Sequence, residues 1–175
     1  AIRAVTLTGS TGAGKKVASQ AGENLKKTVL ELGGSDAYLV LEDADVDLAV
    51  EKCTQSRLLN SGQSCISAKR FIVHQSLVDD FSEKMKKNFE QKKWGDPLEK
   101  GQDLGPMAKT DLRDELHEQV KKSIEKGATC ITGGEIPDLE GAFYPPTVLK
   151  DVKPGQPAFD EELFGPVAAI ISFDN

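Results

Sequence analysis

Residues 6–16 read TLTGSTGAGKK, a stretch in which a short alternating segment leads into a glycine-rich turn. The residues before Gly9 alternate as in a β-strand, and residues 15–25 can form a helix, so the glycines lie at a strand-to-helix turn. Backbone N–H groups and the positive end of a helix at such a turn bind phosphate groups, including the pyrophosphate of a dinucleotide. The stretch therefore predicts a strand–turn–helix unit, and it leaves open whether the turn binds a triphosphate, a dinucleotide or no ligand.

The last position of this turn argues against a triphosphate. Gly9, Gly14 and Lys15 satisfy the pattern of a nucleoside triphosphate loop, which requires Ser or Thr next, but Lys16 stands there. That hydroxyl coordinates the magnesium ion that bridges the terminal phosphates, and a second ammonium group would repel the metal. A P-loop-type nucleotide-binding protein is therefore the less favoured alternative.

Strand and helix signals alternate along the whole chain. The predicted strands are residues 5–8, 29–32, 38–41, 71–73, 128–132, 144–149 and 167–173. Apolar residues at helical spacing predict helices over 46–53, 78–89 and 112–124, the last with Thr110 or Asp111 as its cap and Gly127 at its end. Strands that alternate with helices of this length predict an α/β fold with a largely parallel sheet.

Charge and hydropathy exclude two classes of partner. The formal net charge is −6, and the lysines are interleaved with glutamates on helix faces, so no basic stripe for nucleic acid is present. The longest apolar run, residues 167–171, is too short to cross a bilayer, and no secretory signal precedes it. We expect a cytoplasmic protein that binds neither nucleic acid nor membranes. Because the chain starts and stops at strands without an initiator Met, we also expect it to be a segment of a longer protein.

The three cysteines differ in their surroundings. An odd number of widely spaced cysteines fits neither a disulfide framework nor a metal site, and favours a reducing compartment. Cys53 and Cys130 lie in apolar patterns and are predicted core residues. Cys65 lies in the polar stretch NSGQSCIS, residues 60–67, which leaves a predicted helix. A thiolate near helix-terminal N–H groups is stabilised, so Cys65 is the candidate nucleophile.

The candidate base for such a nucleophile is Glu31. His74 and His117 occupy positions typical of surface residues, which weakens a papain-like hydrolase. Glu31 ends an apolar strand, where partial desolvation would raise the pKa of its carboxyl group towards the range useful for proton abstraction. The alternative for Glu31 is a strand-end residue that pairs with a nearby lysine, and the residues alone do not decide between the two.

Four motifs in order resemble those of the aldehyde dehydrogenase superfamily. They are TGST at 8–11 with Gly14, ELGG at 31–34, GQSC at 62–65 and EELFGPV at 161–167. The resemblance covers the whole chain, including LGPM at 104–107 and YPPT at 144–147. The sequence as a whole is most similar to those of bacterial succinate-semialdehyde dehydrogenases.

The resemblance implies NAD(P)-dependent oxidation of an aldehyde, with succinate semialdehyde or another short semialdehyde as the expected substrate. Cys65 would attack the carbonyl group to give a thiohemiacetal, which passes a hydride to the nicotinamide ring and leaves a thioester. Glu31 would deprotonate the water that hydrolyses this thioester. The residues implied to contact NAD or NADP are Gly9, Ser10, Gly14, Leu32, Gly33, Glu162 and Phe164; no metal is implied.

The same resemblance implies a domain organisation. Residues 1–30 would be the C-terminal remnant of an NAD(P)-binding domain, and residues 31–175 a catalytic domain truncated at its C-terminal end. The asparagine with which the family stabilises the oxyanion is absent from this chain, so the segment alone is expected to be inactive, whereas the parent protein is expected to be a homo-oligomer, a dimer or a tetramer. A catalytically silent folding or interaction module is the alternative.

The resemblance does not extend to one position that binds the substrate in some members of the family. Some succinate-semialdehyde dehydrogenases carry an arginine just before the Asn-x-Gly-Gln stretch, where it holds the distal carboxylate of the substrate. Leu59 occupies that position here, and Arg57, two residues earlier, is an open alternative.

Overall fold

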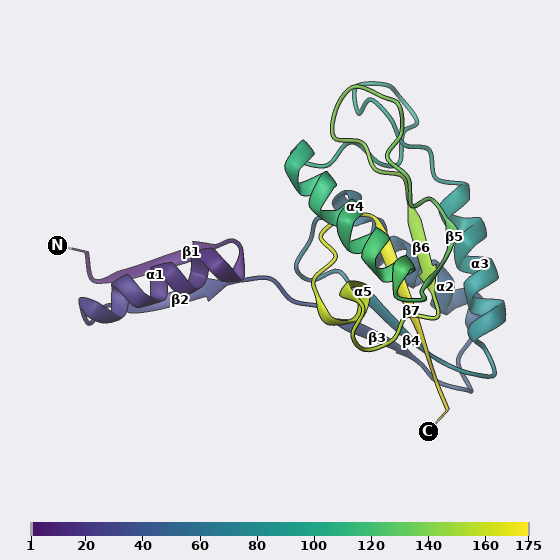
Figure 1. The fold of residues 1–175 in the computed structure, drawn as a ribbon, viewed down its shortest axis with the longest axis horizontal. Coiled ribbons are helices and arrows are strands. Elements are labelled where there is room, and N and C mark those ends of the chain that lie inside the picture. The colour runs from purple at the N-terminus through teal and green to yellow at the C-terminus, as the bar shows by residue number, and fades with distance from the viewer. Residues whose placement is uncertain (1, 175) are drawn as a thin grey trace. The chain divides into compact units, whose positions relative to one another are not determined.

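The computed structural model describes residues 2–174 and contains two compact units, Ala1–Gly34 and Ser35–Asn175. The first unit holds strand β1, helix α1 and strand β2, and the remaining elements belong to the second unit (Figure 1). The division follows Gly34 rather than residue 30, because Glu31 is the last residue of β2 and pairs with Thr8 of β1. The ELGG motif therefore belongs to the first unit.

The first unit is a parallel β–α–β arrangement. Strands β1 (Ala4–Thr8) and β2 (Lys27–Glu31) pair in parallel and are joined by α1 (Thr11–Glu23). The helix begins at Thr11, earlier than the predicted start at residue 15, because the Ser10 hydroxyl accepts a hydrogen bond from the Ala13 N–H group at 3.2 Å and caps the first turn. The second half of the glycine-rich stretch is thus helical.

The second unit is built on a five-stranded sheet of order β3-β4-β7-β6-β5. Its strands are Ala37–Val40 (β3), Arg70–His74 (β4), Thr129–Thr132 (β5), Thr147–Lys150 (β6) and Val167–Phe173 (β7). All neighbouring pairs are parallel except β5 with β6, which is antiparallel and irregular between Cys130 and Thr132. The predicted α/β fold with a largely parallel sheet is confirmed.

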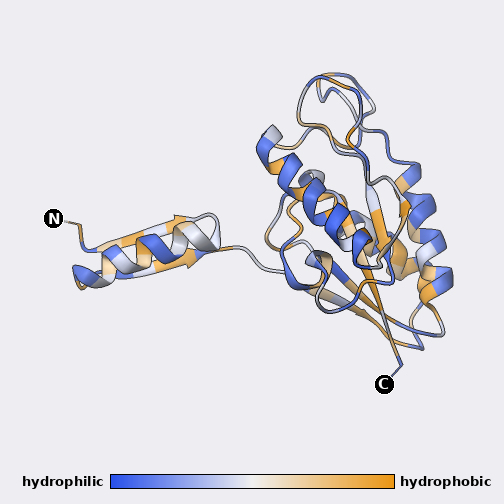
Figure 2. Ribbon diagram, viewed as in Figure 1, coloured by the Kyte–Doolittle hydropathy of each residue, from blue (hydrophilic) through white to orange (hydrophobic). Residues whose placement is uncertain are grey.

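Helices cover both faces of this sheet. They are α2 (Val46–Leu58), the 3₁₀ turn η1 (Leu59–Gly62), α3 (Val78–Glu90), α4 (Thr110–Glu125) and α5 (Pro157–Asp160). Along β7, Ala168 and Ile170 pack with residues of α2 and α3, whereas Val167 and Ala169 pack with residues of α4 and α5. Because side chains alternate along a strand, these are two cores on opposite faces. The outward faces of the helices are hydrophilic, and β6 and β7 between them are hydrophobic (Figure 2).

Some predicted boundaries are wrong by a few residues, and α2 extends to Leu58 where the predicted helix ends at residue 53. The strand expected from residue 144 begins at Thr147, because Pro145 and Pro146 have no N–H group to donate to a ladder. Helix α4 is preceded by Lys109 in an extended conformation, so neither Thr110 nor Asp111 is its cap. Among the described residues, no helix combines the length and the apolar character that a membrane span requires.

Candidate functional site

In the first unit, the predicted phosphate turn and the end of β2 lie together. The Gly9 N–H group donates to the Glu31 carbonyl oxygen at 3.0 Å, which continues the pairing of β1 with β2 beyond Thr8. The first-turn N–H groups of Thr11 and Gly12 have no helical acceptor, as at any helix start. The carboxyl ends of two parallel strands and an open helix N-terminus thus form one edge, the place where open α/β sheets bind their ligands.

Gly14, Leu32 and Glu31 have different environments at this edge. A Cβ atom on Gly14 would lie 2.5 Å from Leu32 Cδ1, so this glycine lets the half-buried Leu32 side chain pack against α1. Glu31 and Gly33 are exposed. The desolvation expected for Glu31 is therefore not found within the first unit, because the last residue of this two-stranded pair points its side chain into solvent.

In the second unit, Cys65 follows a turn with an unusual backbone. Asn60, Ser61 and Gly62 all have left-handed conformations, with φ of 53°, 53° and 74°. Such angles are costly for residues with a Cβ atom and persist only where side chains fix them. The Asn60 amide donates to the Gln63 carbonyl oxygen at 3.0 Å, and the Ser61 hydroxyl donates to the Gly105 carbonyl oxygen at 2.9 Å. The polar residues that drew attention to this stretch in the sequence hold its backbone.

The cysteine turn is packed against the glycine of the EELFGPV motif. A Cβ atom on Gly62 would lie closer than 3.0 Å to the carbonyl oxygen of Gly165, a separation that real Cβ atoms essentially never show. Gly165 is enclosed on its other side by Leu116 of α4 and by Met107. The GQSC, LGPM and EELFGPV motifs therefore meet in one place, although they are distant in the sequence.

Two fully buried cations lie beneath the cysteine turn. Arg57 donates to the carbonyl oxygens of Gly62 and Ala68, the latter at 3.1 Å. Lys69 Nζ donates to the carbonyl oxygens of Ser64 at 2.9 Å and Cys65 at 2.8 Å. Buried cations require partners of this kind, because charge is costly to remove from water. Cys65 itself is exposed.

Arg57 is fully buried, so its side chain is not accessible to a substrate. Burial lowers the pKa of its guanidinium group to about 10, while the charge of Glu162 opposes the shift, so the group stays charged at neutral pH. Its role as an alternative holder of a substrate carboxylate is therefore not supported, because its hydrogen bonds go to the main chain. Leu59 is exposed beside this turn.

Lys69 connects the cysteine turn with the second predicted cofactor motif. Its Nζ atom lies 3.2 Å from Glu162 Oε1, with a side-chain exposure of 0% for Lys69 and 25% for Glu162. This contact is an ion pair rather than a hydrogen bond, because the Oε1 atom is buried and receives no hydrogen bond from the described residues. Sequence reasoning missed Lys69. The signal was a lysine directly before an arginine and an apolar strand, where a charged side chain at a buried strand start needs a partner.

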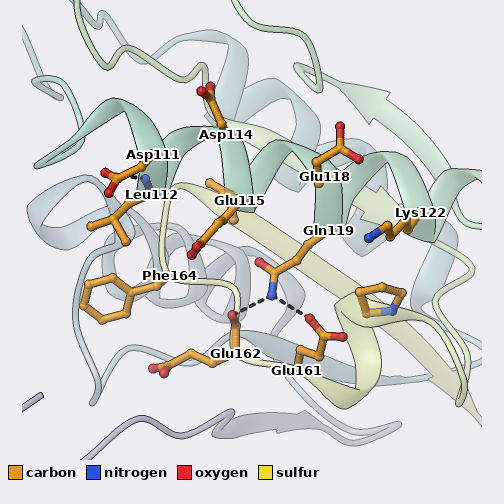
Figure 3. A pocket seen from close by; sticks show the side chains of 12 residues that line it. Asp111, Leu112, Asp114, Glu115, Glu118, Gln119, Lys122, Glu161, Glu162 and Phe164 are labelled. Atoms are coloured by element: carbon orange, nitrogen blue, oxygen red, sulfur yellow. Dashed lines mark hydrogen bonds between the residues drawn. The ribbon is translucent and has the colours of Figure 1, made fainter. Parts of the chain in front are cut away.

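Glu162 and Phe164 lie at a hollow of about 670 Å³ between α4 and the residues that follow α5 (Figure 3). Gln119 of α4 donates to the Glu161 carboxylate at 2.8 Å and to the Glu162 carbonyl oxygen at 3.3 Å. The hollow is strongly acidic, with the carboxylates of Asp111, Asp114, Glu115, Glu118, Glu161 and Glu162 along it. Carboxylates accept hydrogen bonds from hydroxyl groups and repel phosphates, so this hollow suits the sugar part of a ligand.

The other cysteines and the histidines are held by their own surroundings. Cys53 is buried, which confirms its predicted place in the core, and burial raises the pKa of its thiol to about 12. Burial also raises the pKa of the half-buried Cys130. His74 Nδ1 lies 2.8 Å from the Ser76 hydroxyl, and His117 Nδ1 lies 3.2 Å from the Tyr144 hydroxyl. Within residues 2–174, His, Cys, Asp and Glu side chains form no group that could hold a metal ion.

Comparison with known proteins gives consistent matches over the whole chain. The model of the aldehyde dehydrogenase family matches residues 1–175. A succinate semialdehyde dehydrogenase of Escherichia coli, named as acting with NAD(P)+, is 52% identical over 169 residues, which are 97% of this chain and 37% of that protein. A probable NADP+-dependent succinate-semialdehyde dehydrogenase of Synechocystis is 48% identical over 174 residues, which cover 99% and 38% of the two chains.

Solved structures agree with the relatives. The crystal structure of succinate-semialdehyde dehydrogenase from Burkholderia pseudomallei superposes with a TM-score of 0.96 at 36% identity, over 99% of this chain and 36% of that chain. The chain thus spans little more than a third of the length of the proteins that it matches.

Proposed function

The chain belongs to the aldehyde dehydrogenase family, and we propose on that premise that it carries the catalytic centre of an NAD(P)+-dependent enzyme that oxidises an aldehyde to a carboxylic acid. The proposed substrate is succinate semialdehyde or another short semialdehyde, as named for its relatives in Escherichia coli and Synechocystis. The observation that carries the proposal is the exposed Cys65 on a turn whose buried support, Lys69, also pairs with Glu162.

In this proposal Cys65 is the nucleophile. Its thiolate attacks the carbonyl carbon, and the resulting thiohemiacetal loses the hydride of the former aldehyde carbon to become a thioester. NAD(P)+, when bound, accepts that hydride. Glu31 takes a proton from the water that attacks the thioester, so the acid leaves and the Cys65 sulfur is regenerated. A turn with a left-handed backbone held by side-chain hydrogen bonds suits a nucleophile, because it fixes the sulfur without needing rearrangement during the reaction.

The cofactor roles are divided between the two units. The open N-terminus of α1, with Gly9 and Ser10, suits the pyrophosphate, because its N–H groups and the helix dipole favour phosphate oxygens. Gly14 would serve indirectly by seating Leu32, and Gly33 would permit close approach of the cofactor.

In the second unit, the Glu162 carboxylate is partly exposed, with Oε1 turned towards Lys69, and is an acceptor suited to a hydroxyl group of the nicotinamide ribose. Phe164, which is 39% exposed at the acidic hollow, offers a ring against which the nicotinamide would pack. The first unit would then be the last part of a cofactor domain, and the second unit most of a catalytic domain.

The test requires a complete enzyme. We define the full-length enzyme as a full-length protein that contains this chain, obtained directly or by replacing the matching segment of the Escherichia coli relative. Formation of reduced nicotinamide is followed by absorbance with succinate semialdehyde, acetaldehyde and benzaldehyde, each with NAD+ and with NADP+. Turnover with one of these aldehydes is expected from the full-length enzyme, and none from the 175-residue chain alone.

Two variants then assign the roles. Cys65→Ser is expected to lower kcat by about 10³-fold or more, whereas Cys130→Ala, a change at a half-buried cysteine, leaves turnover nearly unchanged. Glu31→Gln is expected to accumulate the thioester, visible by mass spectrometry as an acyl group on the Cys65 peptide. Ordinary turnover by Cys65→Ser would show that another group is the nucleophile.

A further inference from the structure

The side chain of Lys69 ends in an ammonium group that is fully enclosed by protein. Lysine is almost never fully buried without a partner. The main chain at Lys69 is held as part of the sheet, because its N–H group donates to the Asp36 carbonyl oxygen at 3.0 Å and its carbonyl oxygen accepts from the Ala169 N–H group at 3.1 Å. The side chain therefore starts from a main-chain position that is fixed by two hydrogen bonds.

The ammonium group contacts two separate segments of the chain. Of the three N–H groups of an ammonium, two are accounted for by the carbonyl oxygens of Ser64 and Cys65. The charge of the ammonium group is also paired with the Glu162 carboxylate, without a hydrogen bond. One side chain thus joins the backbone of the proposed nucleophile to the carboxylate proposed to accept the ribose hydroxyl.

No other described contact fixes the Glu162 carboxylate. Gln119 binds the main chain of Glu162 and the neighbouring Glu161 carboxylate, while the Glu162 carboxylate points away from Gln119 (Figure 3). Arg57 acts on Glu162 only through its charge, because its hydrogen bonds go to the main chain. Without the ammonium group, the charge on the buried Oε1 atom would have no cation in contact, and we expect the carboxylate to rotate towards solvent.

We propose that Lys69 is a positioning residue that holds the Cys65 turn and the Glu162 carboxylate in one fixed geometry, and that the affinity for the nicotinamide cofactor depends on it. This inference rests on the proposed function, since it concerns the residues that would bind NAD(P)+ there. Lys69 touches neither substrate nor cofactor in this role; it acts through Glu162 and through the carbonyl groups of the turn.

The experiment measures cofactor binding directly. Lys69→Met in the full-length enzyme keeps the length of the side chain and removes its charge. The dissociation constant is obtained by titration with NADPH or NADH, followed by nucleotide fluorescence, and kcat is measured separately at saturating cofactor. The dissociation constant is expected to rise about 10-fold, as for loss of a contact to a charged group, and kcat is expected to fall as well. Lys126→Met is the control, since the exposed Lys126 also donates to a main-chain carbonyl oxygen, that of Gly155.

A double-mutant cycle separates positioning from general damage. If Lys69 acts through Glu162, Lys69→Met should weaken cofactor binding by less than about 2-fold once Glu162→Gln is present. The reason is that the free-energy effects of substitutions at two contacting residues are not additive. General loosening of the fold would instead multiply the two effects. Should Lys69→Met fail to fold, as judged by thermal unfolding, Lys69→Gln retains an N–H donor for the turn without the charge and is expected to weaken binding in the same way.

The results that would overturn the role of Lys69 differ from the results that would overturn the proposed function. A dissociation constant unchanged in Lys69→Met, or effects that multiply in the double variant, would overturn the role of Lys69 and leave aldehyde oxidation by Cys65 standing. Absence of Cys65-dependent turnover in the unsubstituted enzyme would instead count against the proposed function, whatever the binding measurements gave.

Discussion

Replacing Gly62 with alanine tests how the cysteine turn is built. Gly62 has φ of 74°, and its Cα faces the main chain of Gly165 so closely that a Cβ atom would overlap with it. The obstacle is backbone, namely the carbonyl group of Gly165 and the nitrogen of Pro166, and cannot move away as a flexible side chain would. We therefore expect Gly62→Ala to displace the turn that carries Cys65.

The loss of stability expected for Gly62→Ala has two parts. A left-handed conformation costs a residue with a Cβ atom about 1–2 kcal/mol. Forcing an extra methyl group into a packed region costs about 1–3 kcal/mol more. The sum, about 2–5 kcal/mol, is a large part of the stability of a typical domain. A shift of about 1 Å in the nucleophile would also lower kcat by about 10²-fold.

A matched variant isolates the cost of the overlap with the Gly165 main chain. Gly101 has φ of 88°, and a Cβ atom there would meet nothing within 4 Å, so Gly101→Ala carries the backbone cost without the overlap. Thermal unfolding and turnover of the full-length enzyme are measured for both variants. Gly101→Ala is expected to lose about 1–2 kcal/mol and to keep its kcat. If Gly62→Ala were no less stable and no less active than Gly101→Ala, the close packing of the two motifs would be refuted.

Two further predictions concern buried groups near this site. Burial raises the pKa of the Cys53 thiol to about 12. The contribution of this protonated thiol to the free energy of unfolding is complete below the unfolded pKa of about 8.5. It is lost as the pH rises towards 12, because only the unfolded chain releases the proton in that range. The free energy of unfolding, measured by denaturant titration at several pH values above 8, should therefore fall less steeply in Cys53→Ala, and iodoacetamide at pH 8 should label Cys65 but not Cys53 in the native protein; labelling of both would contradict the burial. Arg57→Met leaves the carbonyl groups of Gly62 and Ala68 without a donor and is expected to cost about 2–4 kcal/mol, yet to leave the ratio of kcat/KM for succinate semialdehyde and butyraldehyde unchanged. A selective loss with the semialdehyde would show that Arg57 recognises the substrate carboxylate after all.

Local sequence determined the elements of this protein and the identity of its candidate nucleophile. The alternation before Gly9 and the apolar spacing of the later helices are properties of neighbouring residues, so the α/β class could be predicted from them. Cys65 stood out because small polar residues surround it, and those residues do hold its turn. Errors of a few residues arose where capping was decided by a single side chain, as at Ser10, or where prolines removed donors.

The sequence could not decide which way the charged side chains point. Arg57 at the end of a helix and Lys69 before a strand have the pattern of surface residues, yet both are fully buried. Main-chain carbonyl groups accept their hydrogen bonds, and the distant Glu162 pairs with the charge of Lys69. The same holds for Gly62, whose need to be glycine comes from Gly165 far along the chain. Periodicity and propensity act between residues close in sequence, whereas hydrogen bonds to buried cations and contacts between two loops exist only after the sheet order β3-β4-β7-β6-β5 has brought those segments together.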